Sequence, residues 1–208
     1  MAHALRTSVE DFIEGLKSIE QGLITRDLVC DYVNTMRLTP EALKPYIFFN
    51  KDNYTRNLIY RDPRFEIMTI CWLPGQRTVV HTHNGSLGWM SMVQGEVDVH
   101  NYHYLKCNKP ENQNVVGLDC LAGATQIDME RIGTMHCVPG GDVNTVDKLQ
   151  TIHQIENADP ARAGAVSLHV YSPPIDSCVA FDLEHQRCFR RSLRYTTEYG
   201  HPSKGPSH

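Results

Sequence analysis

Two histidines separated by a single residue, His81 and His83, are the sequence feature with the clearest chemical meaning. In a β-strand, side chains at positions i and i+2 point to the same side of the sheet. On the inner face of a small β-barrel, two imidazoles arranged in this way can bind one metal ion. A third ligand is needed, and His153 is the candidate, because a distant strand can lie opposite the pair in a closed sheet.

The glycines around this pair set it apart from the other histidines. An isolated His-x-His pair more often lies on a solvated strand edge, so His100, His103 and His136 receive no role. The pair at 81 and 83, in contrast, stands between Gly75 and Gly95, a frame that resembles the first motif of the cupin family. The segment from His153 to Asn157 resembles the end of the second cupin motif.

Gly88 is an informative departure from that pattern. Most metal-binding cupins have a glutamate ligand at this position, and its loss leaves three neutral imidazoles around the ion. This set carries one negative charge fewer than the 2-His-1-carboxylate iron site. The ion then favours an anionic ligand from the substrate, and a thiol bound to a metal is deprotonated. Three histidines therefore suit thiolate chemistry, but imidazole binds zinc, iron, copper and nickel, so the ligands alone leave the metal open.

Helices precede the segments that carry these histidines. Apolar residues recur at helical spacing after a candidate N-cap at Ser8 or Thr7: Val9, Phe12, Ile13, Leu16 and Ile19. Thr39 followed by Pro40 marks the start of a further short helix.

From about Phe65 the pattern changes to short strands separated by turns. Gln94-Gly95, between predicted strands 89–93 and 96–104, indicates a hairpin. Further strands are predicted at 65–73, 125–132, 149–156, 165–171, 179–182 and 188–195. We expect an all-β core with a cupin or jelly-roll β-barrel, preceded by short N-terminal α-helices. We expect a single domain over residues 1–208, with helices at about 8–46, the barrel at about 54–196 and a flexible tail at 197–208.

Composition excludes several classes of function. The 20 basic and 24 acidic residues are scattered, which argues against a nucleic-acid surface. No stretch approaches the ~20 apolar residues that span a bilayer, and the N-terminus has no apolar signal segment. The 7 cysteines are odd in number and form no C-x-x-C pair, which predicts a cytoplasmic protein.

Three further stretches resemble the cysteine dioxygenase family. They are Tyr54-Thr-Arg-Asn-Leu58, Cys71-Trp72, and Val166-Ser-Leu-His-Val-Tyr-Ser-Pro-Pro174 followed by Asp176-Ser-Cys178. With the metal motif, the resemblance extends from about Tyr54 to Asp182.

This resemblance implies a role for each matching residue. His81, His83 and His153 are expected to hold one Fe(II) per chain, and Arg56, helped by Tyr54, to bind the substrate carboxylate. Tyr171 is expected to donate a hydrogen bond in the cavity, oriented by His169. The full set of expected site residues is His81, His83, His153, Arg56, Tyr54, His169 and Tyr171. The partners are a small thiol, L-cysteine first, and O2, and the product is a sulfinic acid.

Outside the resemblance, Tyr171 reads as an ordinary core tyrosine and Arg56 as an exposed salt-bridge arginine. Vertebrate members of the family have a cysteine at the position of Gly88, and this cysteine forms a thioether with the tyrosine. Bacterial members, which this chain resembles, do not have this thioether. We therefore expect an unmodified Tyr171.

Four alternatives remain open. Relatives that oxidise 3-mercaptopropionate have glutamine in place of Arg56, so arginine favours cysteine. A cysteamine dioxygenase is disfavoured because cysteamine has no carboxylate for Arg56 to bind. A non-catalytic metal-binding cupin is disfavoured because it needs neither Arg56 nor Tyr171. A zinc hydrolase needs a general base, and this sequence places no carboxylate for that role, since Glu156 is expected to face away from His153 in a strand. The oligomeric state and the pathway are not determined by the sequence.

Overall fold

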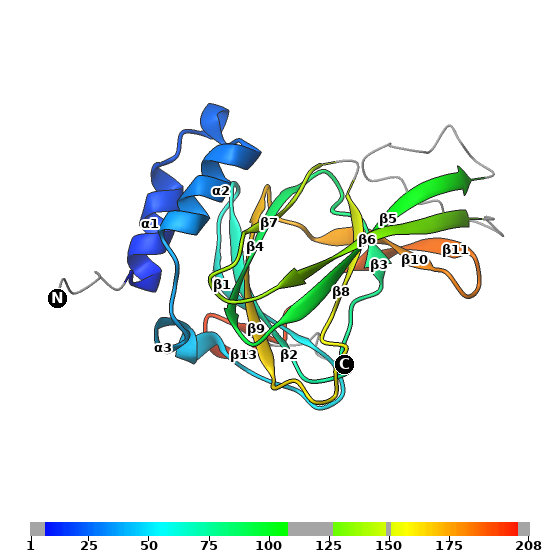
Figure 1. Ribbon diagram of the computed structural model, residues 1–208. Coiled ribbons are helices and arrows are strands. Elements are labelled where there is room, and N and C mark those ends of the chain that lie inside the picture. The colour runs from blue at the N-terminus through cyan, green and yellow to red at the C-terminus, as the bar shows by residue number, and fades with distance from the viewer. Residues whose placement is uncertain (1–6, 108–126, 149–150, 204–208) are drawn as a thin grey trace.

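Two β-sheets face each other in the computed structural model, which describes residues 7–107, 127–148 and 151–203 (Figure 1). The strand order is β13-β12-β1-β2-β9-β4-β7 in one sheet and β11-β10-β3-β8-β5-β6 in the other. This is the predicted jelly-roll arrangement of the cupin type. Over the described residues the two sheets do not join into one closed hydrogen-bonded barrel.

The helices are α1 (Val9–Ser18), α2 (Arg26–Thr35) and α3 (Pro40–Leu43), with single 3-10 turns η1 (Gln21–Leu23) and η2 (Lys44–Tyr46). The strands of the first sheet are β1 (Thr55–Arg61), β2 (Glu66–Trp72), β4 (Leu87–Gln94), β7 (Asn144–Val146), β9 (Ala165–Ser172), β12 (Thr197–Glu198) and β13 (His201–Pro202). The strands of the second are β3 (Val80–His81), β5 (Val97–Cys107), β6 (Ile127–Cys137), β8 (Ile152–Glu156), β10 (Ser177–Asp182) and β11 (Arg187–Ser192).

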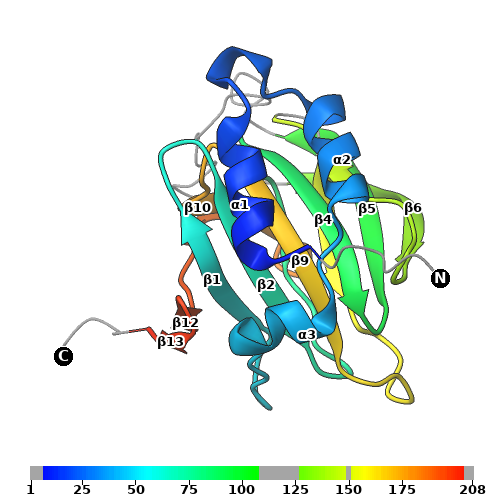
Figure 2. The same ribbon diagram turned by 90° about the vertical axis from the view of Figure 1, so that its left-hand side faces the viewer.

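Helices α1 and α2 cover the outer face of the seven-stranded sheet (Figure 2). Helix α1 begins where predicted, because the Ser8 side chain accepts a hydrogen bond from the Asp11 amide at 3.0 Å. Thr39 caps α3 in the same way, with Pro40 in the first turn. No described helix is both long and apolar enough to cross a membrane.

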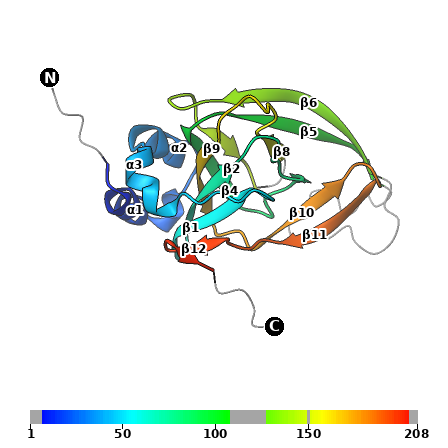
Figure 3. The ribbon, with the colours of Figure 1, turned by 90° about the horizontal axis from the view of Figure 1, so that it is seen from below.

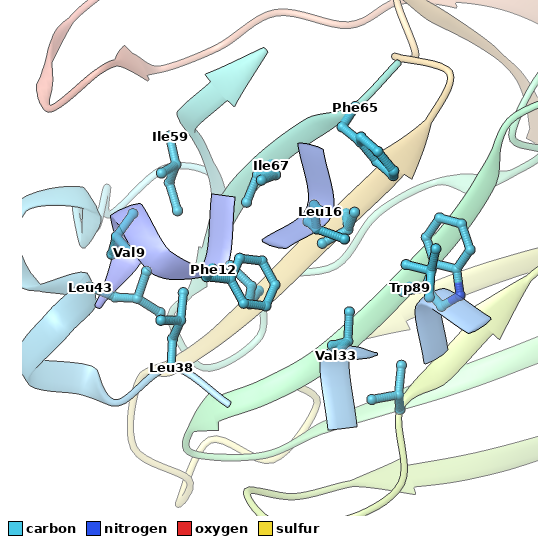
Figure 4. Close-up of a cluster of buried hydrophobic side chains, with 14 residues drawn as sticks. Val9, Phe12, Leu16, Val33, Leu38, Leu43, Ile59, Phe65, Ile67 and Trp89 are labelled. Carbon is cyan, nitrogen blue, oxygen red and sulfur yellow. The ribbon is translucent and has the colours of Figure 1, made fainter. Parts of the chain in front are cut away.

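The apolar stripe of α1 holds the helical layer to the sheet. Phe12 and Leu16 are completely buried and lie against side chains from the sheet, among them Ile67 of β2 and Trp89 of β4 (Figure 4). Burial of this size is a main source of folding free energy. This core lies behind the sheet, so it fixes the position of strands whose other face points to the interior.

Replacing Phe12 with alanine is expected to lower the free energy of unfolding by about 3–5 kcal/mol, because it leaves a cavity under α1. Chemical denaturation measures the change. The control is Glu10→Ala on the exposed side of the same helix, which is expected to change stability by less than about 0.5 kcal/mol. Equal effects of the two substitutions would contradict the described packing of α1.

Strands β2 and β9 are buried along their whole length, because the helices cover one face and the second sheet covers the other. In β9, Leu168 and Val170 join the core under the helices. The residues between and beside them, Ser167, His169 and Tyr171, therefore point into the interior. This period-two alternation places three polar side chains on one inner wall.

The turn at Gln94-Gly95 does not form the predicted hairpin. Strand β4 pairs with β7 and β9, whereas β5 pairs with β6 and β8, so the chain passes from one sheet to the other at this turn. Gly95 has a φ of 64°, and a Cβ at this position would lie 2.8 Å from the Cα of Ala165. Glycine is required here for a sheet-to-sheet corner.

The C-terminal segment also differs from the expected flexible tail at 197–208. Strand β12 pairs in parallel with β1 and lies beside it in Figure 3, and β13 pairs with β12. The Thr197 hydroxyl donates to the buried Asn57 side-chain oxygen at 3.0 Å. Residues 197–203 thus extend the first sheet, because β1 offers them a free edge. The rest of the predicted tail lies outside the described residues, as does Cys120.

Candidate metal centre and its pocket

The structure brings His81, His83 and His153 together between the two sheets. His81 ends β3 and lies directly opposite His153 of β8 in the strand pairing, while His83 follows two residues after β3. One ring nitrogen from each histidine lies within 4.8 Å of the others. The Nε2 atoms of His83 and His153 are 3.1 Å apart.

All three imidazoles are held in the neutral form. Burial lowers the pKa of His81 to about 4 and places the pKa values of His83 and His153 well below the ordinary value. The Nδ1 of His81 donates to the carbonyl oxygen of Val79 at 2.8 Å, so its Nε2 lone pair is available. Neutral imidazoles with available lone pairs are the form that binds a metal ion.

This cluster fits a metal ion. Nitrogen ligands lie about 2.1 Å from a transition metal, so two ligands at right angles are about 3 Å apart, in agreement with the His83–His153 separation. The Nδ1 atom of His153 is buried without a hydrogen-bond partner among the described residues, and a pair of neutral rings satisfies one N–H···N bond at most. A cation bound between the rings would accept the Nε2 lone pairs of His83 and His153, which point toward each other.

A hydrogen-bonded chain along β9 leads to the cluster. The Trp72 indole N–H donates to Ser167 Oγ at 3.0 Å, Ser167 Oγ lies 2.8 Å from His169 Nε2, and His169 Nδ1 lies 3.2 Å from the Tyr171 hydroxyl. Since the carbonyl of Ile70 is 3.5 Å away, the better acceptor for the Ser167 hydroxyl is His169. His169 then donates from Nδ1 to the oxygen of Tyr171.

This arrangement leaves the Tyr171 proton free to be donated into the pocket. Burial raises the pKa of the Tyr171 hydroxyl, so the proton stays on oxygen at neutral pH. Burial also lowers the pKa of His169 to about 3, with a smaller effect of the same sign from the positive charge of Arg56. The ring of Tyr171 is stacked on that of His83, with centroids 6.3 Å apart.

Gly88 lies against the ring of Tyr171. A Cβ added at Gly88 would be 3.0 Å from two atoms of that ring and 2.6 Å from a methyl group of Val146. The position beside the tyrosine therefore holds no side chain. Tyr171 thus has no thiol partner at position 88.

We expect the intact mass of the protein to equal the mass calculated from its sequence, because no thioether can form between residue 88 and Tyr171. Mass spectrometry of the intact chain and of the peptide containing Tyr171 checks this result. The peptide containing Trp89 from the same digest is the control. A loss of two hydrogen atoms in a peptide that links Tyr171 to a cysteine would contradict the prediction.

Arg56 lies in the same pocket as His81 and His83, with Tyr54, Tyr171 and Cys178 in its wall. The pocket contains about 460 Å³ of empty space, part of it open to solvent. The guanidinium of Arg56 is largely buried, and its Nε and Nη2 have no hydrogen-bond partner among the described residues. These two groups form the edge of the fork that pairs with carboxylates. Tyr54 lines the pocket and stacks on Trp72 with ring centroids 4.9 Å apart.

Sequence reasoning missed the carboxylate behind Arg56. Glu66 is completely buried, 3.8 Å from Arg56 Nη2 and 3.6 Å from Arg61 Nη1. It accepts hydrogen bonds from the Ile175 amide at 3.0 Å and from the Tyr195 hydroxyl. The signal in the sequence is a lone glutamate at the start of an otherwise apolar strand, a position that a charged residue occupies only when it has partners.

The histidines left unassigned lie away from the cluster. His100 contacts Glu156 at 3.2 Å, and Glu156 points away from His153 as predicted. His136 lies between Asp98 and Glu96, each at 2.8 Å. Together with the two facing sheets, the three clustered histidines define a metal-binding cupin.

Comparison with known proteins gives the family. Residues 3–184 match the family described as Cysteine dioxygenase type I, and the chain belongs to that family. Cysteine dioxygenase type 1 of Homo sapiens is 26% identical over 162 residues, 77% of this chain and 72% of that protein. The Danio rerio protein of the same name is 24% identical over 200 residues, 93% of this chain and 88% of that one.

Among solved structures, a crystal structure of a Thermus thermophilus protein is similar, with a TM-score of 0.43 and 19% identity over 63% of this chain and 93% of that chain. The family match and the three-histidine cluster support a cupin thiol dioxygenase.

Proposed function

We propose that this protein is an Fe(II)-dependent dioxygenase that converts L-cysteine and O2 to cysteine sulfinic acid. The observation that carries the proposal is the position of Arg56: a largely buried guanidinium, whose Nε and Nη2 have no hydrogen-bond partner among the described residues, lies in the pocket that also contains His81 and His83. A small thiol with a carboxylate can reach both groups at once.

His81, His83 and His153 are the proposed ligands of the iron. When bound, iron(II) supplies a Lewis acid that favours the thiolate and a redox centre that activates dioxygen. The overall reaction combines RSH and O2 to RSO2H, so both oxygen atoms reach sulfur and no other co-reactant is needed.

The remaining residues bind and orient the substrate. Arg56 pairs with the carboxylate through Nε and Nη2, while Glu66, 3.8 Å from Nη2, supplies a buried negative charge that keeps the guanidinium in place. Tyr54 forms part of the wall beside it. Tyr171 donates its hydroxyl proton as a hydrogen bond to the reacting groups, and His169 holds the tyrosine oxygen in position. The buried walls exclude water, which strengthens each of these polar contacts.

Oxygen uptake by the anaerobically purified, iron-analysed protein tests the proposal. We expect uptake with L-cysteine that depends on iron and yields cysteine sulfinate. A preference for 3-mercaptopropionate keeps the chemistry and rejects cysteine as the substrate. If the folded, iron-loaded protein consumes no oxygen with any thiol, the dioxygenase proposal is wrong and a non-catalytic cupin remains.

A further inference from the structure

A second arginine, Arg191, lies in the wall of the pocket, opposite the sheet that carries Arg56. It belongs to β11 and lies directly across from Cys178 of β10 in the strand pairing. Its side chain is half-buried, and it pairs with no carboxylate within the part of the chain that the structure describes.

The charge of Arg191 acts inside the pocket. Burial raises the pKa of the Cys178 thiol to about 11, and the positive charge of Arg191 opposes this rise more strongly than that of Arg56. The Cys178 thiol on the neighbouring strand thus experiences the positive charge of Arg191, which agrees with the place of both residues in the pocket wall.

The two pocket arginines differ in their counterions. Arg56 has the buried carboxylate of Glu66 at 3.8 Å, shared with Arg61. Arg191 has no such partner among the described residues. A half-buried cation without a counterion gains most from an anionic ligand, because such a contact is only partly screened by water. A ligand with a second carboxylate, bound in the same pocket, can supply one.

We propose that Arg191 binds a second acidic group of the substrate, so that the pocket accepts thiols carrying two carboxylates. The inference rests on the proposed thiol dioxygenase activity and extends its substrate class. One carboxylate pairs with Arg56, the sulfur is placed at the histidines, and the other carboxylate pairs with the guanidinium of Arg191.

Arg190, the neighbour of Arg191 in β11, provides a matched control. It is exposed, donates to the Ser177 hydroxyl at 3.1 Å and is not part of the pocket wall. Adjacent residues of a strand point to opposite faces, so removing the charge of Arg190 changes the net charge equally without changing the wall. The pair Arg191→Gln and Arg190→Gln therefore separates a contact from a general effect of charge.

The test compares mercaptosuccinate with 3-mercaptopropionate, two thiols that differ by one carboxylate on the carbon bearing sulfur. With the iron-loaded protein, kcat/KM is expected to be about 10- to 100-fold higher for mercaptosuccinate, the range for one additional charge-assisted hydrogen bond. Arg191→Gln should reduce this preference about 10-fold or more, Arg191→Lys should retain part of it, and Arg190→Gln should leave it intact.

Anaerobic calorimetry of the two thiols with the same four proteins gives a readout that does not depend on turnover. A binding preference for mercaptosuccinate that is lost in Arg191→Gln supports the inference even if no thiol is oxidised, an outcome that would reject the dioxygenase proposal alone. The inference is overturned by equal affinities for the two thiols in the unsubstituted protein. It is also overturned if Arg191→Gln weakens both thiols by the same factor.

Discussion

Replacing His153 with alanine is expected to remove iron binding and oxygen uptake together. The substitution leaves two imidazoles where three converge, and His153 is the one whose Nε2 lies 3.1 Å from that of His83. Substitution of a residue that hydrogen-bonds to a metal ligand typically costs 10- to 100-fold in metal affinity. Loss of the ligand itself should therefore cost at least about 100-fold. Metal analysis after dialysis and oxygen-electrode assays measure the two effects.

The matched control for this experiment is His103→Ala. His103 lies on β5 of the same sheet, is exposed and is not part of the histidine cluster. We expect this variant to keep its iron and its oxygen uptake. Circular dichroism of both variants separates loss of metal from loss of fold, since His153 is buried. A folded His153→Ala protein with normal iron content would remove His153 from the metal centre.

Replacing Arg56 with alanine is expected to raise the KM for L-cysteine by about 10- to 100-fold, because a charge-assisted pair with the substrate carboxylate is lost. The fold should tolerate the change. Glu66 keeps its hydrogen bonds from the Ile175 amide and the Tyr195 hydroxyl and remains 3.6 Å from Arg61. Steady-state oxygen uptake measures KM and kcat separately.

Two comparisons make the Arg56 result specific. Cysteamine lacks the carboxylate, so any activity with it should change far less than activity with cysteine. Arg56→Lys retains the charge but loses the planar fork, and its KM should lie between those of the unsubstituted protein and Arg56→Ala. An unchanged KM for cysteine in Arg56→Ala would place the carboxylate elsewhere in the pocket.

Much of the candidate site follows from local patterns in the sequence. The spacing of His81 and His83 and the alternation of Ser167, His169 and Tyr171 place these side chains on inward faces because strand geometry repeats every two residues. Helix starts at Ser8 and Thr39 follow from equally local hydrogen bonds. The match to the family described as Cysteine dioxygenase type I agrees with the motifs that carry these residues.

Other features depend on which strands become neighbours, and no local pattern records that choice. Gln94-Gly95 has the composition of a hairpin turn, yet it connects two sheets because β9 occupies the place beside β4. Glu66 and Arg191 each look like single charged residues near apolar segments. Glu66 is buried beside two arginines and accepts a hydrogen bond from Tyr195, 129 positions away. Arg191 becomes part of the pocket because it pairs opposite Cys178.

By itself, then, the amino-acid sequence determined the fold class, the His81–His83 pair and the inward face of β9, since each depends on residue type and short-range spacing. His153 joins the pair because β8 lies beside β3. Tertiary structure alone decided the surroundings of the two pocket arginines and the pairing of β12 with β1. The physical reason is that burial and charge pairing depend on segments far apart in the chain, whose contacts form only when the two sheets pack together.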